Sequence, residues 1–232
     1  MKFSSIVSAR IKSLAKDFGR VLPPRLVFTN QGILNYITLG LWTKAHGFPR
    51  SARLRSRGDV YRHIATEVVE PVLYLEFGVF SGESIAEWSN LLVHPESQLI
   101  GFDSFEGLPE DFDFKHRTLK GELSTQGQIP EINDSRVRFV KGWFHETVPQ
   151  FSIPRHKSLI LNIDCDLYSA TKTVLNSLNP HITIGTLIIF DDMSQIHHEP
   201  TAFSEYMRDT KKDFKLVTES YEDVFVFECT GE

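Results

Sequence analysis

The sequence has few cysteines and no long hydrophobic segment, and each absence excludes a class of protein. Its 232 residues contain only two cysteines, Cys165 and Cys229, and neither belongs to a CxxC pair or a Cys/His zinc spacing. Two cysteines cannot form a disulfide framework, so we expect two ordinary buried thiols. No window reaches about 18 consecutive apolar residues, so no membrane-spanning helix is expected. The N-terminus also lacks the apolar block of a signal peptide, which favours a cytoplasmic location.

Net charge is small, but it is unevenly distributed. The total is -5 and aromatic residues make up 12%, which excludes a globally disordered chain. Residues 1–63 carry twelve Lys or Arg against two acids, a charge of +10, so the remainder carries -15. This difference predicts a boundary near residue 60. We expect a basic, mainly helical N-terminal extension over residues 1–60 and a single domain over residues 61–232.

The extension contains two segments of interest. Apolar residues near helical spacing between Phe3 and Phe18 predict an amphipathic helix, which Pro23 and Pro24 end. Such a helix could lie on an anionic membrane or a nucleic acid, but packing on its own domain or on a second subunit is favoured. We therefore expect no nucleic-acid partner, and a homo-oligomer could form through this arm. Four arginines in the segment 50–57 indicate a solvated connector that could also neutralise an anionic substrate.

From Tyr61 onward, short apolar runs alternate with helical patterns. Strands are expected at 72–77, 99–102, 137–140, 159–163 and 186–190, and helices at about 83–92, 169–178 and 200–211. Two further runs, 214–218 and 224–228, are separated by a polar turn and predict a closing hairpin. The pattern predicts an α/β fold: a doubly wound, mostly parallel seven-stranded Rossmann-like sheet with a C-terminal antiparallel hairpin. The long connection 104–135, rich in Gly, Pro and charge, favours a lid over a site.

Candidate ligand-binding residues follow the first two strands. In an open parallel sheet, ligands bind beyond the carboxyl ends of the strands. The first strand leads into Glu76-Phe-Gly78-Val-Phe-Ser-Gly82, whose ExGxxxG spacing differs from the dinucleotide pattern GxGxxG and favours a smaller ligand. The second strand ends at Asp103, where an acid can accept both hydroxyl protons of a ribose. Each feature alone could be structural, but together they favour a nucleoside-type cofactor.

Acidic residues follow the fourth and fifth predicted strands. Asp164 and Asp166 come after one, and Asp191 and Asp192 after the other. Like charges converging at one sheet edge cost several kcal/mol, or force protonation, unless a cation is present. All-oxygen ligands select Mg²⁺, with Mn²⁺ or Ca²⁺ also suitable. We expect Asp164, Asp191 and Asp192 to be the ligands, with Asp166 capping the following helix. In the alternative interpretation, all four acids only cap helices.

Five segments of the chain share the pattern of one known family. They begin at residues 75, 101, 140, 164 and 189 and read LEFGVFSGES, GFDSFEGLPE, VKGWFHETVP, DCDLYSAT and IFDD. Together they resemble the macrocin O-methyltransferase family, and the resemblance covers about residues 70–195. Members of this family are class I, metal-dependent S-adenosylmethionine enzymes that methylate sugar hydroxyls in antibiotic biosynthesis.

The resemblance implies a role for each site residue. The residues implied to bind S-adenosylmethionine are Glu76, Gly78, Ser81, Gly82, Ser84, Asp103, Ser104, Gly142, Trp143, Phe144 and Asp164. Glu76 and the glycine turn would hold the methionine end, Asp103 the ribose, and Ser104 with segment 142–144 the adenine. Asp164, Asp191 and Asp192 would bind Mg²⁺, which would lower the pKa of an acceptor hydroxyl, and Asp164 is also the candidate general base. The implied activity is Mg²⁺-dependent methyl transfer to a hydroxyl of a small molecule, such as a sugar or glycoside.

Other interpretations stay open on the sequence alone. Asp164-Cys-Asp166 could be the DxD of a nucleotide-sugar glycosyltransferase, although that would not explain ExGxxxG. The domain could also bind a cofactor without catalysing a reaction, which the intact motifs argue against. His197 or His198 could act as a base or contact substrate, or both could be exposed loop residues. We assign no chemistry to His145.

Overall fold

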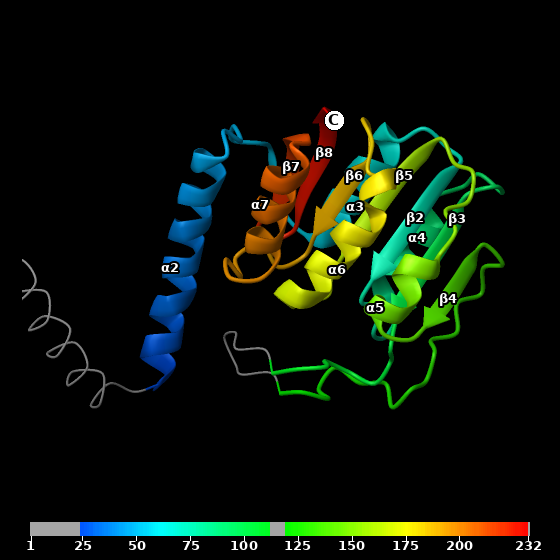
Figure 1. Ribbon diagram of the computed structural model, residues 1–232, viewed down its shortest axis with the longest axis horizontal. Coiled ribbons are helices and arrows are strands. Elements are labelled where there is room, and N and C mark those ends of the chain that lie inside the picture. Colours follow the sequence, from blue (N-terminus) through cyan, green and yellow to red (C-terminus); the bar gives the residue numbers. More distant parts are fainter. Residues whose placement is uncertain (1–23, 112–118, 232) are drawn as a thin grey trace, which may run out of the picture.

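The protein forms one eight-stranded sheet, seen in a computed structural model that describes residues 24–111 and 119–231 (Figure 1). Strand order is β1-β7-β8-β6-β5-β2-β3-β4, and only the pairs β6–β8 and β7–β8 are antiparallel. The strands are β1 Arg53–Leu54, β2 Val72–Phe77, β3 Gln98–Asp103, β4 Val137–Lys141, β5 Ser158–Ile163, β6 Leu187–Phe190, β7 Asp213–Ser220 and β8 Phe225–Gly231. The predicted α/β fold with its closing hairpin is confirmed. The two-residue strand β1, paired with β7, adds to the seven expected strands.

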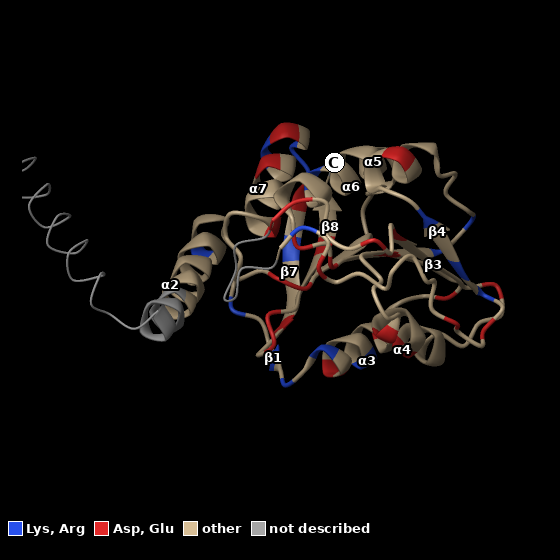
Figure 2. Ribbon diagram, turned by 90° about the horizontal axis from the view of Figure 1, so that it is seen from below, with Lys and Arg blue, Asp and Glu red and all other residues tan. Residues whose placement is uncertain are grey.

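Helices cover both faces of the sheet. Figure 2 shows α3 (Arg57–Glu67) and α4 (Glu83–Leu91) on one face, and α5 (Phe144–Thr147), α6 (Tyr168–Leu178) and α7 (Glu199–Thr210) on the other. Two 3₁₀ turns, Val148–Gln150 and Asn179–His181, follow α5 and α6. All six residues of β2 are buried, because alternate side chains enter opposite cores. On the α3/α4 side, Tyr74 packs 5.0 Å from Trp88, measured between ring centroids.

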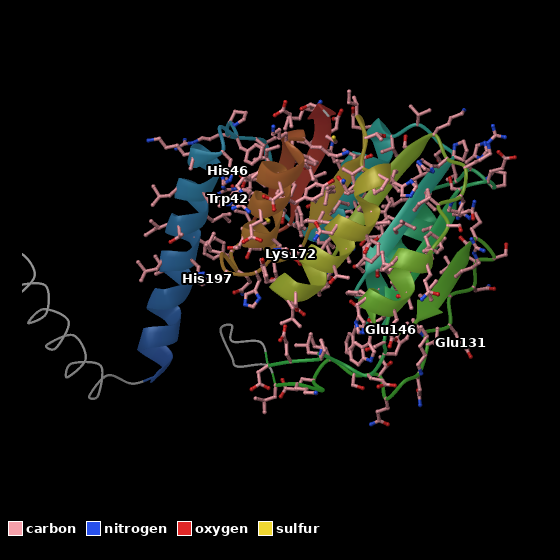
Figure 3. All side chains as sticks on the ribbon, viewed as in Figure 1. Trp42, His46, Glu131, Glu146, Lys172 and His197 are labelled. Carbon is pink, nitrogen blue, oxygen red and sulfur yellow. The ribbon has the colours of Figure 1, made fainter. Side chains whose placement is uncertain are left out.

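The sequence analysis expected a mainly helical extension without giving the bounds of α2 (Pro24–Ala45), and it did not predict α3. Gly32 and Gly40 both lie inside α2, and a β-carbon at either would meet no atom within 4 Å. Contacts with the domain stabilise the helix: the Trp42 indole N–H donates to Ser204 Oγ at 2.7 Å, and Trp42 lies 6.4 Å from Phe203. Figure 3 shows Trp42 and His46 on the side of α2 that faces α7. Tertiary packing thus outweighs the low helix propensity of glycine.

Several expectations for the N-terminal part stay predictions. The amphipathic helix expected over residues 3–18 lies outside the described residues, and so does any contact of that arm with a second subunit. The division at residue 60 is also untested. In the part of the chain that is described, no helix combines the length and the apolar character that crossing a membrane requires. Cys165 and Cys229 are buried free thiols, as expected.

The order of the strands reverses between β2 and β5, and this places the site. β3 and β4 lie beyond β2 on one side, and β6 lies beyond β5 on the other. Connections leaving β2 and β5 therefore run to opposite faces and leave a crevice at the carboxyl ends of these strands. The predicted site residues lie at the carboxyl ends of β2, β3, β4, β5 and β6 or in the segments that follow them.

Candidate functional site

A cavity of about 790 Å³ opens at the carboxyl ends of β2, β3 and β5. This volume lies within the range of about 300–1,000 Å³ that is typical of small-molecule sites. The predicted cofactor residues that line it are Glu76, Gly78, Ser81, Ser84, Asp103, Ser104, Gly142, Trp143, Phe144 and Asp164. Gly82 is not among the lining residues. It is instead the N-cap of α4, with φ of 81°, and a β-carbon there would lie 3.0 Å from the Pro130 ring.

Gly78 allows the ends of β2 and β5 to touch. Its φ is 92°, and a β-carbon at this position would lie 1.8 Å from the carbonyl oxygen of Asp164. The backbone on either side is held by two hydrogen bonds, from Gly78 N to Phe102 O and from Asp164 N to Phe77 O, both 3.0 Å. Only glycine fits this crossing, because any side chain would collide with main-chain atoms. The first glycine of the turn therefore brings the cavity floor against Asp164.

Asp103 is held rigidly at the end of β3. One carboxylate oxygen accepts the N–H groups of Val79 and Phe80 at 2.8 and 2.9 Å, and the other accepts the N–H of Phe105 at 2.7 Å. These bonds tie the glycine turn to the neighbouring strand. A carboxylate offers about four acceptor positions, so one remains for a ligand hydroxyl. Asp103 thus lies where a ribose was expected, and it also orders the loop around it.

Glu76 is a buried acid on the α3/α4 side of the sheet. The Tyr74 hydroxyl donates to Glu76 Oε2, and only 1% of the Glu76 residue is exposed. Burial raises the pKa of the Glu76 carboxyl to about 8, although the bond from Tyr74 and the charge of Arg57 both act in the opposite direction. A cationic group of a ligand would favour the ionised form, so Glu76 is suited to bind an amino group.

Arg57 connects two of the predicted metal ligands. Its Nη1 lies 3.3 Å from Asp164 Oδ2, and its Nη2 lies 3.0 Å from Asp191 Oδ2. Burial raises the pKa of Asp164 to about 8 and that of Asp191 well above its usual value, while the nearby guanidinium lowers both. The arginine-rich segment was expected to be a solvated connector, and for Arg57 this was wrong. The Arg57 side chain lines the cavity and is 41% exposed.

Asp166 does not cap the following helix, so that prediction was also wrong. The N-cap of α6 is Leu167, without a side-chain cap, whereas Asp166 has φ of 60° and hydrogen-bonds to Asp192. The positive φ turns the Asp166 side chain away from the helix start and toward the acids that follow β6. Burial and Asp192 raise its pKa to about 8. Asp166 therefore belongs to the acidic cluster.

Glu199 is a further member of this cluster that the sequence analysis missed. It is fully buried at the start of α7, and its Oε2 accepts the N–H of Asp192 at 3.1 Å. Burial raises the pKa of the Glu199 carboxyl well above its usual value, and the charge of Asp192 raises it further. No pattern in the sequence separates Glu199 from an ordinary acid in the first helical turn.

The acids offer the oxygen donors that a hard cation prefers, but they do not surround a common centre. No group of three or more His, Cys, Asp or Glu among residues 24–111 and 119–231 is arranged as a metal site. The cluster Asp164, Asp166, Asp191, Asp192 and Glu199 nevertheless brings five carboxyl groups together, and Arg57 contacts two of them, Asp164 and Asp191. The donor chemistry therefore suits Mg²⁺, and the observed contacts place Arg57 between two of the donors.

The histidines differ in their surroundings. His198 is half-buried, and its Nδ1 accepts the N–H of Tyr168 at 3.2 Å, which joins the start of α6 to the start of α7. Burial lowers the pKa of His198, in agreement with an unprotonated Nδ1. His197 and His145 are exposed, and His145 also lines the cavity. Whether His197 or His198 contacts a substrate remains a prediction.

Part of the long connection lies over the cavity. The residues of this segment that line it are Ser104, Gly107, Leu108, Pro109, Glu110, Lys120 and Leu123. Ser169 Oγ, at the start of α6, donates to Glu110 Oε1 at 2.7 Å and so joins the two sides of the opening. These positions agree with the expected location of a lid, whose movement stays a prediction.

A recognisable signal for Arg57 was present in the sequence. Ser56 is the N-cap of α3, and its hydroxyl accepts the N–H of Asp59 at 3.2 Å. The pattern Ser-x-x-Asp before an apolar-periodic segment is typical of a helix start. It would have placed Arg57 in the first turn of a helix rather than in a connector. Its contact with Asp164 could not be inferred, because 107 residues separate the two in sequence.

Comparisons with known proteins agree with this geometry. The model of the family described as macrocin-O-methyltransferase (TylF) matches residues 43–220. The chain is 31% identical over 136 residues to 8-demethyl-8-(2,3-dimethoxy-alpha-L-rhamnosyl)-tetracenomycin-C 4'-O-methyltransferase of Streptomyces olivaceus, a match covering 51% of each chain. It is 30% identical over 111 residues to mycinamicin III 3''-O-methyltransferase of Micromonospora griseorubida, which covers 39% of this chain and 41% of the relative. The matched part thus spans about half or less of these relatives' length.

A solved structure shows the same fold. The O-methyltransferase NovP superimposes with a TM-score of 0.58 and 23% sequence identity, covering 75% of this chain and 79% of NovP. At this level of identity the similarity concerns the fold, which is that of class I methyltransferases.

Proposed function

Because the chain belongs to the macrocin O-methyltransferase family, we propose that it transfers a methyl group from S-adenosylmethionine to a hydroxyl group of a small molecule. The observation that supports this most directly is the cavity at the strand-order reversal, lined by residues from four of the five motifs. Relatives that act on sugar-bearing natural products favour a sugar or glycoside as the acceptor. In this scheme, residues 61–232 form the catalytic domain and residues 1–60 the extension.

We propose that the cavity binds S-adenosylmethionine along the turn that follows β2. The cofactor supplies an electrophilic methyl group on a positively charged sulfur. Glu76 would pair with the amino group of the methionine portion. That portion would lie on the cavity floor, where the backbone of Gly78 meets that of Asp164. Asp103, already oriented by three backbone N–H groups, would accept a hydrogen bond from one ribose hydroxyl. Trp143 and Phe144 would cover the adenine, since aromatic faces stack well on bases.

We further propose that Asp164, Asp191 and Asp192 hold a divalent cation, Mg²⁺ in the first instance. When bound, the ion would lower the pKa of the acceptor hydroxyl and help to orient it. The excess of carboxyl groups over the one guanidinium beside them supports this proposal, because carboxyl groups this close together can all be ionised only when a cation offsets their repulsion. Mn²⁺ or Ca²⁺ would satisfy the same donors.

Asp164 is the proposed general base. It lies at the cavity, so its carboxylate can reach an acceptor bound beside the cofactor. As an ionised carboxylate, Asp164 would take the hydroxyl proton of the acceptor as that oxygen attacks the methyl group. The cavity wall formed by Leu108, Leu123 and Trp143 would exclude water, which would otherwise compete with the acceptor as a nucleophile.

Two measurements test the proposed function. Isothermal titration with S-adenosylmethionine should give one site per chain, and no binding would reject the proposal. Methyl transfer to a panel of diols and glycosides should then be detected, and it should fall on adding EDTA and return with Mg²⁺. Asp191→Asn should lose the response to Mg²⁺, whereas Asp213→Asn, which alters an exposed acid at the start of β7, should keep it.

A further inference from the structure

Arg57 is the cation that faces the acid pair. Its guanidinium reaches one carboxylate from β5 and one from β6, at 3.3 Å from Asp164 Oδ2 and 3.0 Å from Asp191 Oδ2. The same Nη1 donates to Ser84 Oγ, 3.2 Å away, in the first turn of α4. One side chain thus joins the predicted metal ligands to the wall of the cofactor cavity.

The position of Arg57 in its own helix is unfavourable. It is the first residue of α3, where the positive end of the helix dipole and the free N–H groups repel a cation. The backbone is fixed there by the Ser56 cap and by a bond from Arg57 N to Glu222 Oε2 at 2.8 Å. The guanidinium is held there by Asp164 and Asp191 and by its hydrogen bond to Ser84 Oγ. The Arg57 side chain is 41% exposed and also lines the cavity, so open space lies beside the guanidinium.

We infer that Arg57 is an internal competitor of the divalent cation: its guanidinium neutralises Asp164 and Asp191 in the metal-free protein and must leave them when the ion binds. This inference rests on the proposed metal dependence. A planar guanidinium bridges two carboxylates well, and a second cation beside it would be repelled. The apparent affinity for the ion is then the intrinsic affinity reduced by the fraction of molecules in which Arg57 has moved away. Arg57 would thereby set the ion concentration at which the site fills.

Titration calorimetry with MgCl₂ on the complete chain tests this inference, comparing the wild type with two variants. Arg57→Gln should bind Mg²⁺ at least about tenfold more tightly than the wild type, because the competing population is lost. Arg53→Gln is the matched control. Arg53 lies four residues earlier and pairs with Glu219 at 2.8 Å, outside the cavity. Its removal should leave the Mg²⁺ affinity unchanged.

Each outcome decides the inference. Equal or weaker Mg²⁺ binding by Arg57→Gln would overturn it while leaving the proposed metal dependence intact. If Arg57→Gln bound Mg²⁺ and the wild type did not, the competition would be supported. The wild-type protein would then work without Mg²⁺, and that part of the proposed function would be rejected. Binding by neither protein would reject both proposals.

A second measurement on the wild type keeps the test valid if Arg57→Gln does not fold. The side-chain Nε–Hε resonance of Arg57, assigned by comparison with Arg57→Lys, should shift as Mg²⁺ is added and saturate together with the heat of binding. Saturation of the ion site without any change in this resonance would overturn the inference. The Arg53 resonance provides the internal reference.

Discussion

A β-carbon at Gly78 would lie 1.8 Å from the carbonyl oxygen of Asp164, so the turn that follows β2 and the end of β5 can meet only through a glycine. Asp164 is also the proposed base and metal ligand. The same contact therefore closes the cavity floor and positions the acid. This relationship leads to the first prediction.

Gly78→Ala should lose cofactor binding and stability together. The alanine would have to adopt φ of 92° and displace the Asp164 backbone. We expect affinity for S-adenosylhomocysteine to fall at least about tenfold, and the free energy of unfolding to fall by more than the ~1–2 kcal/mol that a left-handed residue costs. Gly185→Ala is the control, since its φ is 89° but no atom lies within 4 Å of the added carbon. If both variants lost the same stability and both bound normally, the contact with Asp164 would be unimportant.

Glu76→Gln should change how stability depends on pH. The pKa of Glu76 is about 8 in the folded protein and about 4.3 in an unfolded chain, so the folded state retains a proton that the unfolded state releases. Its contribution to stability is therefore greatest below pH 4 and declines as the pH rises toward 8. At pH 9 we expect Glu76→Gln to be more stable than the wild type by at least ~1.4 kcal/mol, the value of one pKa unit. Urea unfolding at pH 5 and pH 9 measures the difference.

Glu67→Gln serves as the control for that experiment, because Glu67 is an exposed acid at the end of α3. Its stability should follow that of the wild type at both pH values. An identical pH profile for Glu76→Gln and the wild type would mean that Glu76 is ionised in the folded protein.

Trp143→Ala should weaken cofactor binding with little effect on folding. Trp143 lines the cavity and is only partly buried, so its removal takes an aromatic face from the proposed adenine site. Stacking on a base contributes ~1–3 kcal/mol, which predicts a loss of about tenfold or more in affinity for S-adenosylhomocysteine. Tyr221→Ala removes an exposed aromatic outside the cavity and should bind normally in the same titration. Unchanged binding by Trp143→Ala would place the adenine elsewhere.

Arg136→Ala should destabilise the edge of the sheet. The Arg136 guanidinium donates to Asp134 Oδ2 at 2.6 Å and to the carbonyls of Ser89, Leu92 and His94, which would otherwise lack these partners near the end of α4. We expect a loss of ~2–3 kcal/mol, visible as a fall in melting temperature of several degrees. Arg138→Ala is the matched control, because Arg138 is exposed and donates to Gln98 alone at 2.8 Å. Equal losses in the two variants would contradict this account.

The pair with Arg136 also determines the response of Asp134 to acid. Hydrogen bonds from Arg136 lower the pKa of Asp134 below its usual value. Its contribution to stability is therefore present above about pH 4 and is lost as the pH falls through the folded-state pKa. Asp134→Asn should reduce the loss of stability between pH 5 and pH 2 in thermal unfolding. If Asp134→Asn lost the same stability between pH 5 and pH 2 as the wild type, the pair of Asp134 and Arg136 would have no net effect on stability.

The sheet could be predicted from the sequence because each strand corresponds to a short apolar run of neighbouring residues. Val72–Phe77 and Leu187–Phe190 are nearly continuous apolar runs, which only strands covered on both faces tolerate. α6 and α7 follow the expected ranges to within one residue at each end. The bounds of α2 within the expected helical extension were not predicted, because the helix is stabilised by contacts of Trp42 with α7, which is distant in sequence.

The site was predicted by position but not by contact. The rule that strand ends converge brought Asp103 and Asp164 to one cavity, because it depends only on topology. The directions of the side chains could not be predicted in the same way. Asp166 has a positive φ and hydrogen-bonds to Asp192, and no sequence pattern indicates either feature. Arg57 was misplaced because its partners lie more than 100 residues away, and ion pairs of that separation leave no local signal.

The most direct test of the central claim is a crystal structure with S-adenosylhomocysteine and Mn²⁺, with data collected at the manganese absorption edge. The account predicts the nucleoside in the cavity beside Asp103 and Trp143, and an anomalous peak within coordination distance of Asp164, Asp191 and Asp192. A nucleoside bound elsewhere, or saturating Mn²⁺ without a peak at these acids, would contradict it.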